Sequence, residues 1–210
     1  MLFDQDGNLK IQQLFSYPND NYNDLKREAL KCSRCQLRDG AKGVVMGEGS
    51  TDNKIMLVGE GPGANEDRLG RPFVGRAGKL MDKILKAVNL EREELYITNV
   101  IKCRPPGNRV PHQNEFEACV SILRAEIELI QPKVIVTLGS TATKYLINPE
   151  ESITKVRGKW FQRGDIFFLP TFHPAYLLRN ENMKKYSWYD FKLIKKAADR
   201  IKKLSNSGEL

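Results

Sequence analysis

The sequence predicts an α/β protein: one three-layer α/β/α domain spanning residues 1–210, with a central, mainly parallel four-stranded sheet. Three observations lead to this prediction. Short apolar runs alternate with longer segments of helical periodicity, as in sheets that are covered on both faces. The runs are rich in β-branched and aromatic residues, which strands favour. Neither a linker, a repeat nor a low-complexity segment divides the chain, whose length suits a single sizeable core.

The four predicted strands are compact apolar runs at residues 54–59, 95–102, 133–140 and 165–172. Parallel strands buried on both faces read in this way, as nearly continuous apolar stretches. Ligands of open parallel sheets bind beyond the carboxyl ends of the strands. We therefore expect the polar residues that follow these four runs to meet in space.

The predicted helices carry apolar residues three and four positions apart. They cover residues 22–31, 76–89, 114–131, a short segment after residue 140, and a basic C-terminal helix at 184–204. Pro132 ends the third of them, because proline cannot continue a helix. Residues 36–53 are expected to be loop-like, and residues 1–20 to form a peripheral N-terminal segment.

The charge balance favours a polyanionic partner. Lys and Arg number 34 against 26 Asp and Glu, a net charge of +8. Such an excess suits nucleic acid, although many basic proteins bind none. No run reaches the roughly 20 apolar residues of a membrane helix, and the N-terminus lacks a basic region followed by an apolar one. We expect a cytoplasmic protein that has no membrane partner and acts as a monomer.

A glycine-rich loop follows the first predicted strand and almost matches two nucleotide-binding motifs. The glycines from Gly59 onward fit the dinucleotide pattern, but Pro62 lies inside it and no helix is expected immediately afterwards. The P-loop spacing is also present, but Arg76 and Ala77 stand where Lys and Ser/Thr are required. The glycines instead indicate a backbone that turns sharply or passes close to a ligand.

Two side chains of this loop suit a flat, hydrogen-bonding ligand better than a pyrophosphate. Phe73 could stack on a heterocycle or simply pack in the core. Glu60 could position water or polarise a group, or it could cap backbone amides of the turn. The sequence alone leaves both pairs of alternatives open.

Asn99 and His173 lie at the ends of two further predicted strands. Asn99 is polar within an apolar strand, and its amide offers a donor and an acceptor side by side. It could read the edge of a base or make a structural hydrogen bond. His173 precedes Pro174, which fixes the chain direction there. The other histidine, His112, is assigned no role.

The four cysteines suggest a metal site. Cys32 and Cys35 form a C-x-x-C pair, whereas 15 residues lie between Cys103 and Cys119. In a cytoplasmic chain, metal ligation is favoured over disulfides. Structural zinc usually joins two closely spaced pairs, while iron–sulfur clusters accept looser spacing. Spacing therefore leaves zinc, a cluster and free buried thiols open.

Four motifs together resemble the family 4 uracil-DNA glycosylases, the iron–sulfur-containing type of bacteria and archaea. They are GEGPGANED, GRPFVGRAG, TNVIKCRPPGNRVP and HPAYLLRN, within a resemblance that runs from about Cys32 to Arg179. It implies the uracil-DNA glycosylase fold and a hydrolase for base-excision repair. Such an enzyme flips uracil out of single- or double-stranded DNA, cleaves the N-glycosidic bond and leaves an abasic site.

Two other functions remain as alternatives. A family 5-like glycosylase would accept a broader range of bases, but that family usually lacks an acidic residue at the place of Glu60. A non-catalytic nucleic-acid-binding module with a metal-stapled fold would explain the charge and the cysteines. It would not explain chemically loaded residues at successive strand ends.

The resemblance assigns roles to the residues of the expected site. Gly59, Glu60 and Gly61 would form the first catalytic loop, with Glu60 positioning the attacking water. His173 would donate to uracil O2. The base itself would be held by stacking on Phe73, by edge contacts from Asn99, and by Glu66 near C5, where it would reject thymine.

The resemblance also assigns a cofactor and a DNA surface. All four cysteines (Cys32, Cys35, Cys103 and Cys119) would hold one 4Fe–4S cluster with a structural role. The residues expected against the DNA backbone are Pro62, Arg104, Arg109 and Arg179. The N-terminal residues 10–17 could dock on a sliding clamp, although an apolar patch of this kind more often packs on its own domain.

Overall fold

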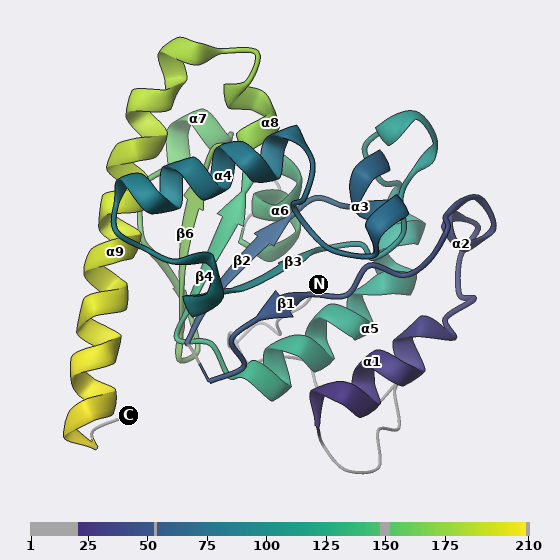
Figure 1. Ribbon diagram of the computed structural model, residues 1–210, viewed down its shortest axis with the longest axis horizontal. Coiled ribbons are helices and arrows are strands. Elements are labelled where there is room, and N and C mark those ends of the chain that lie inside the picture. The colour runs from purple at the N-terminus through teal and green to yellow at the C-terminus, as the bar shows by residue number, and fades with distance from the viewer. Residues whose placement is uncertain (1–20, 53, 148–151, 209–210) are drawn as a thin grey trace.

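In the computed structural model, which describes residues 21–52, 54–147 and 152–208, the core of the molecule is a mixed sheet (Figure 1). In the described residues this sheet has six strands in the order β1-β3-β2-β4-β6-β5. Its four inner strands are parallel: β3 (Tyr96–Asn99), β2 (Ile55–Gly59), β4 (Val134–Leu138) and β6 (Ile166–Thr171). They are the four strands that the sequence predicts.

The prediction of only four strands was wrong at both edges of the sheet. Strand β1 (Glu48–Gly49) pairs antiparallel with β3, and β5 (Phe161–Arg163) pairs antiparallel with β6. Their exposed or half-buried side chains give no apolar run to detect. Residues 36–53 are likewise not all loop, because they contain β1 and the short helix α2 (Leu37–Gly40).

Side chains of the inner strands alternate between two cores, as the strand period of two requires. Met56 and Val58 join the core on one face, and Ile55 and Leu57 join the core on the other. The first core is covered by α1 (Tyr22–Leu30), α5 (Gln113–Ile130) and α6 (Gly139–Leu146). The second is covered by α4 (Arg76–Ala87) and α9 (Lys184–Ser207), so helices lie on both faces of the sheet.

These five helices confirm the predicted helical segments, and α9 continues three residues beyond its predicted end. Figure 1 shows α1 along α5, and α4 close to α9. No helix in the described part of the chain is both long and apolar enough to cross a membrane. The N-terminal segment 1–20, with its expected clamp-docking residues, lies outside the described residues.

The expectation that no helix follows the glycine-rich loop was also wrong. Helix α3 (Ala64–Leu69) begins directly after it, with Glu66 and Asp67 in its first turn and Gly70 ending it at φ 67°. Acidic side chains stabilise a helix N-terminus, and glycine tolerates the left-handed end. The remaining short helices are η1 (Arg92–Glu94), η2 (Pro106–Asn108), α7 (Ile153–Val156), α8 (Pro174–Leu177) and η3 (Glu181–Met183).

Candidate active site

A cavity of about 520 Å³ opens at the carboxyl ends of the parallel strands. The structure brings most of the sequence-predicted site residues to its wall: Glu60, Gly61, Pro62, Glu66, Phe73, Asn99, Arg109, His173 and Arg179. Gly59, Arg104 and the four cysteines are not among its lining residues. The convergence follows from topology, since β2, β3 and β6 all end at this edge of the sheet.

Phe73 and His173 form a flat part of the wall. Their ring centroids lie 5.6 Å apart with an interplanar angle of 31°. Gly59 lies behind this wall: a Cβ atom there would meet both the Phe73 ring and Asn99 Oδ1 at 2.5 Å. Glycine is therefore required at residue 59 because the stacking ring and the amide both press on its backbone.

Asn99 is the last residue of β3, and only 2% of its surface is exposed. Its side-chain oxygen Oδ1 has no hydrogen-bond partner among the described residues. Buried polar atoms almost always have partners, and leaving one without a partner costs about 1–3 kcal/mol. An unpaired oxygen on a cavity wall therefore marks the place where a ligand donates a hydrogen bond.

A buried ion pair holds the backbone of Asn99. The Lys102 amine lies 2.5 Å from a Glu126 carboxylate oxygen, and it also donates to the Thr98 hydroxyl at 2.6 Å and the Asn99 carbonyl at 2.8 Å. Both charged side chains are essentially inaccessible, at 1% and 0% exposure. The backbone amide of Lys102 meanwhile donates to Cys119 Sγ at 3.2 Å.

His173 lies two residues after the end of β6 and caps the short helix α8. Its Nδ1 accepts a hydrogen bond from the Ala175 amide at 3.1 Å, so the ring proton of the neutral imidazole lies on Nε2. Burial lowers the pKa of His173 from 6.5 to about 4; Arg179 also lowers it, whereas Glu66 opposes the shift. Near neutral pH the residue is therefore an uncharged hydrogen-bond donor.

Glu60 stands at the end of β2 and accepts a hydrogen bond from the Thr141 hydroxyl. Thr141 belongs to the first turn of α6, which follows β4, and it lines the same cavity. The contact spans 81 residues of sequence. No motif in the sequence marks Thr141, although it lies just beyond the carboxyl end of a parallel strand, where ligands are expected.

Glu66 supports the loop that carries Phe73. Its Oε1 accepts hydrogen bonds from the backbone amides of Val74 at 2.9 Å and Gly75 at 2.7 Å. The Glu66 carboxylate therefore stabilises the backbone of this loop, a role that the sequence did not indicate. Its expected role in rejecting thymine stays a prediction.

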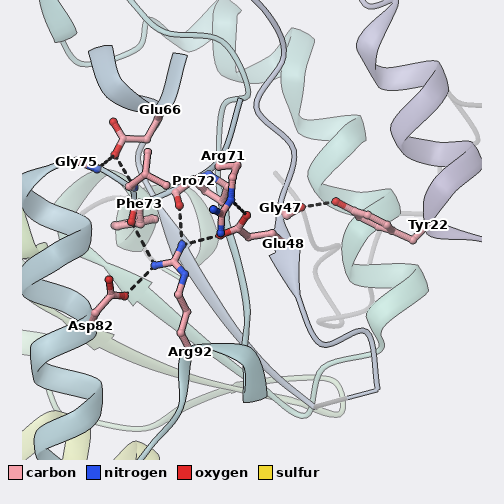
Figure 2. A network of polar contacts seen from close by, with 11 residues as sticks. Tyr22, Gly47, Glu48, Glu66, Arg71, Pro72, Phe73, Gly75, Asp82 and Arg92 are labelled. Atoms are coloured by element: carbon pink, nitrogen blue, oxygen red, sulfur yellow. Dashed lines mark hydrogen bonds and ion pairs between the residues drawn. The ribbon is translucent and has the colours of Figure 1, made fainter. Parts of the chain in front are cut away.

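Arg92, at the start of η1, fixes the same loop from the other side (Figure 2). Its guanidinium donates to the carbonyls of Pro72 at 2.7 Å and Phe73 at 3.2 Å, and it pairs with Glu48 and Asp82 at 2.9 and 3.0 Å. Phe73 has φ 52°, a left-handed conformation that is unfavourable for a bulky residue. Contacts on both sides of the loop hold the ring in this conformation.

We expect Arg92→Met to lower kcat/KM for the reaction in this cavity about tenfold, because a mobile Phe73 ring forfeits part of a stacking contact worth roughly 1–3 kcal/mol. Binding of a flat heterocyclic ligand, followed by calorimetry, should weaken by a similar factor. Arg71→Met is the matched control. Arg71 also pairs with Glu48, at 2.8 Å, but its hydrogen bonds among the described residues go to Glu48 and not to the loop carbonyls that Arg92 holds. Equal losses of kcat/KM in the two variants would show that the ion pairs with Glu48, and not the Arg92 hydrogen bonds to the loop carbonyls, support the reaction.

The four cysteines lie in or against one core of the sheet, outside the lining of the cavity. Cys103 and Cys119 are buried, and Cys32 and Cys35 are half-buried against the same core. Burial raises the pKa of Cys103 to about 12, and the neighbouring Cys35 and Cys32 add to the shift. Burial raises the pKa of Cys119 to about 12; Lys102 opposes this shift, and Cys103 and Cys32 add to it. None of these thiols forms a disulfide with another.

Zinc and an iron–sulfur cluster place different demands on the four thiols. In the described ranges, no three His, Cys, Asp or Glu side chains are arranged to hold one ion. A structural zinc, with Zn–S bonds near 2.3 Å, would bring its sulfurs to within about 4 Å of each other. A 4Fe–4S cluster binds four thiolates, each to its own iron, and so accepts a wider set.

The basic residues expected against DNA differ in their surroundings. Arg109 makes a two-point ion pair with Glu115, at 2.8 and 2.6 Å. Arg104 donates to Asn108 Oδ1 at 2.8 Å. Arg179 is exposed at the cavity. Contact of any of them with DNA stays a prediction.

Comparison with known proteins identifies the class. Residues 46–196 match the sequence model of the Uracil DNA glycosylase superfamily, so the chain belongs to that superfamily. It is 46% identical over 188 residues to the type-4 uracil-DNA glycosylase of Sulfurisphaera tokodaii, covering 85% of this chain and 86% of the relative. The chain is accordingly a member of the type-4 uracil-DNA glycosylase family, which confirms the resemblance seen in its motifs.

Two further relatives support this placement. The type-4 enzyme of Thermotoga maritima is 51% identical over 156 residues, covering 72% of this chain and 80% of the relative. The type-5 uracil-DNA glycosylase of Pyrobaculum aerophilum is only 26% identical over 191 residues, covering 75% of this chain and 84% of the relative. This identity is lower than that to either type-4 relative.

Proposed function

We infer that the protein hydrolyses the N-glycosidic bond of uracil in DNA, releasing free uracil and leaving an abasic site, as the first step of base-excision repair. Family membership supports the reaction class. The observation that carries the assignment to this cavity is the unpaired Oδ1 of Asn99, next to the Phe73 ring. A nucleic-acid-binding module without catalysis would not explain the neutral His173 beside the Phe73 ring.

The residues suit recognition of an extruded pyrimidine. A base in a duplex cannot be reached, so the nucleotide swings out into the cavity at a cost of a few kcal/mol. Phe73 offers its ring face for stacking. Asn99 Oδ1 accepts from uracil N3–H, and its amide nitrogen donates to O4, a pairing that the donor and acceptor of one amide allow.

Bond cleavage leaves negative charge on the departing uracil and positive character on the sugar. The proton on His173 Nε2 would face uracil O2, where the charge develops, and preorganised donors of this kind lower a barrier most effectively. The Glu60 carboxylate, oriented by Thr141, would hold the attacking water and favour the positive sugar. Pro62 and Arg179 would meet the DNA backbone at the rim.

The reaction is tested by incubating the protein with single- and double-stranded oligonucleotides that contain one uracil. Free uracil is then measured by chromatography and abasic sites by alkaline strand cleavage. Matched thymine oligonucleotides test the discrimination assigned to Glu66. Binding to DNA without any release of uracil would favour the non-catalytic module instead.

The rate of uracil release should not depend on a histidine titration near neutrality. With its pKa near 4, His173 is neutral from about pH 5.5 upward, so we expect kcat to be flat through pH 6–8 and to fall toward pH 4. An acid limb that survives in Glu60→Gln belongs to His173. A rate that falls as pH rises through 6–7 would instead require an imidazolium and would contradict this assignment.

We propose further that Cys32, Cys35, Cys103 and Cys119 hold one 4Fe–4S cluster. The support is the family and the gathering of the four side chains from three separate segments. A bound cluster would supply a covalent tie between these segments and no chemistry to the hydrolysis. The residues themselves belong to the loop after α1, the loop after β3 and helix α5.

Replacing Cys103 by serine should abolish stoichiometric iron and lower the thermal unfolding midpoint. The reason is that a lost ligand breaks the tie between segments that otherwise pack as one core. Iron, acid-labile sulfide and zinc are measured together on protein purified without oxygen. Zinc without sulfide would contradict the cluster.

The single-domain organisation, the monomeric state and the sliding-clamp partner also stay predictions.

A further inference from the structure

Three aromatic side chains are exposed at the start of α9. Tyr186, Trp188 and Tyr189 have 39%, 40% and 57% of their surface accessible, and we call them the α9 aromatic patch. The Trp188 and Tyr189 rings meet edge to face, with centroids 5.2 Å apart. A pair of exposed rings in contact, such as Trp188 and Tyr189, is a common feature of interaction surfaces. The catalytic cavity does not use any of them.

Lysine side chains accompany the rings. The Lys185 amine lies 5.0 Å from the centroid of the Tyr186 ring, and the Lys192 amine lies 4.3 Å from that of Trp188. Both lysines are exposed. Rings on which bases can stack, beside cations that can meet phosphates, are the features with which proteins bind single-stranded nucleic acid.

The patch continues from the wall of the cavity. The Arg157 guanidinium lies 5.2 Å from the Tyr186 ring and 5.4 Å from the ring of Phe172, which lines the cavity. Asp190 of α9 holds this arginine, with Nε–Oδ2 at 3.0 Å. Helix α9 follows η3 at once, and η3 contacts α8, which carries cavity residues. One arginine thus separates the patch from the cavity.

We propose that the DNA strand on one side of the extruded nucleotide crosses the α9 aromatic patch. Its bases stack on Tyr186, Tyr189 and Trp188, and its phosphates lie near Lys185 and Lys192. The proposal rests on the proposed function and adds a second, non-catalytic contact with the substrate. The cations beside the rings favour a polyanion over an apolar protein surface.

Fluorescence of Trp188 gives a direct test. The chain has two tryptophans, so Trp160→Phe leaves Trp188 as the reporter. We expect its emission to be quenched by a single-stranded uracil oligonucleotide of about 12 nucleotides, a length within the usual site sizes. A uracil trinucleotide, which fills the cavity alone, should leave the emission unchanged. Unchanged emission at a saturating concentration of the longer strand would overturn the proposal.

Kinetics give the second test. Trp188→Ala should raise the KM for the longer strand roughly tenfold, the loss expected for one stacking contact, and should leave kcat/KM for the trinucleotide unchanged. Trp160→Ala, another exposed tryptophan outside α9, is the matched control and should change neither. Equal losses on both substrates, or a change in oligomeric state of Trp188→Ala, would contradict a DNA contact. Absence of uracil release by the wild type would refute the proposed function itself.

Discussion

Replacing Asn99 by alanine is expected to lower kcat/KM for uracil release about 10²–10³-fold. The substitution removes both edge contacts to the base at once, at a site where the remaining cavity excludes water from the unpaired uracil atoms. Asn99→Asp is the sharper variant, because it keeps the size and the acceptor but removes the donor to O4. We expect it to be impaired as strongly as alanine near neutral pH.

The control for Asn99 is Asn108→Ala. Asn108 also lines the cavity, but its side-chain oxygen is already occupied by Arg104. Its loss should change uracil release only a few-fold. Circular dichroism and thermal unfolding show whether each variant keeps the fold. If Asn99→Ala folds normally and turns over like wild type, the unpaired oxygen has another explanation and the proposed base recognition is wrong.

His173→Ala is expected to reduce kcat about 10²–10³-fold, the usual cost of removing one preorganised donor from a developing oxyanion. The loss should fall on kcat more than on KM, because the hydrogen bond strengthens only as charge builds on O2. His173→Gln retains an N–H donor at a similar reach, on a more flexible side chain, and should recover part of the loss. Single-turnover measurements separate the chemical step from product release.

The chain supplies a matched control for His173 in its other histidine. His112 is exposed and caps the N-terminus of α5, and it does not line the cavity. His112→Ala should therefore leave kcat within a few-fold of wild type. A large loss in both variants would point to a general effect of imidazole removal, and wild-type turnover in His173→Ala would remove this residue from the mechanism.

The sequence predicts the parts of this fold that bury apolar surface. Each inner strand is a run whose side chains feed the two cores, and each long helix has a matching stripe. Strands β1 and β5 escape prediction because they join the sheet by backbone pairing while their side chains stay exposed or half-buried. Helix α3 escapes because Pro62 and the glycines before it suggest a continued loop.

The candidate site divides in the same way. Glu60, Asn99 and His173 are predictable because parallel strands bring their carboxyl ends together, whatever the intervening sequence. Arg92 and Thr141 are not predictable, since they act through contacts with residues far along the chain: 44 residues separate Arg92 from Glu48, and 81 separate Thr141 from Glu60. No local pattern in the sequence records such a contact.

Lys102 connects the cysteines to the proposed base-recognition residue Asn99. Its amide touches Cys119 and its amine holds the carbonyl of Asn99, so one residue joins the two places. A displacement of Cys119 would therefore act on the backbone of Asn99, whose side chain we propose reads the base. Such a displacement would lower the activity of the enzyme, which is less harmful to a genome than the removal of undamaged bases.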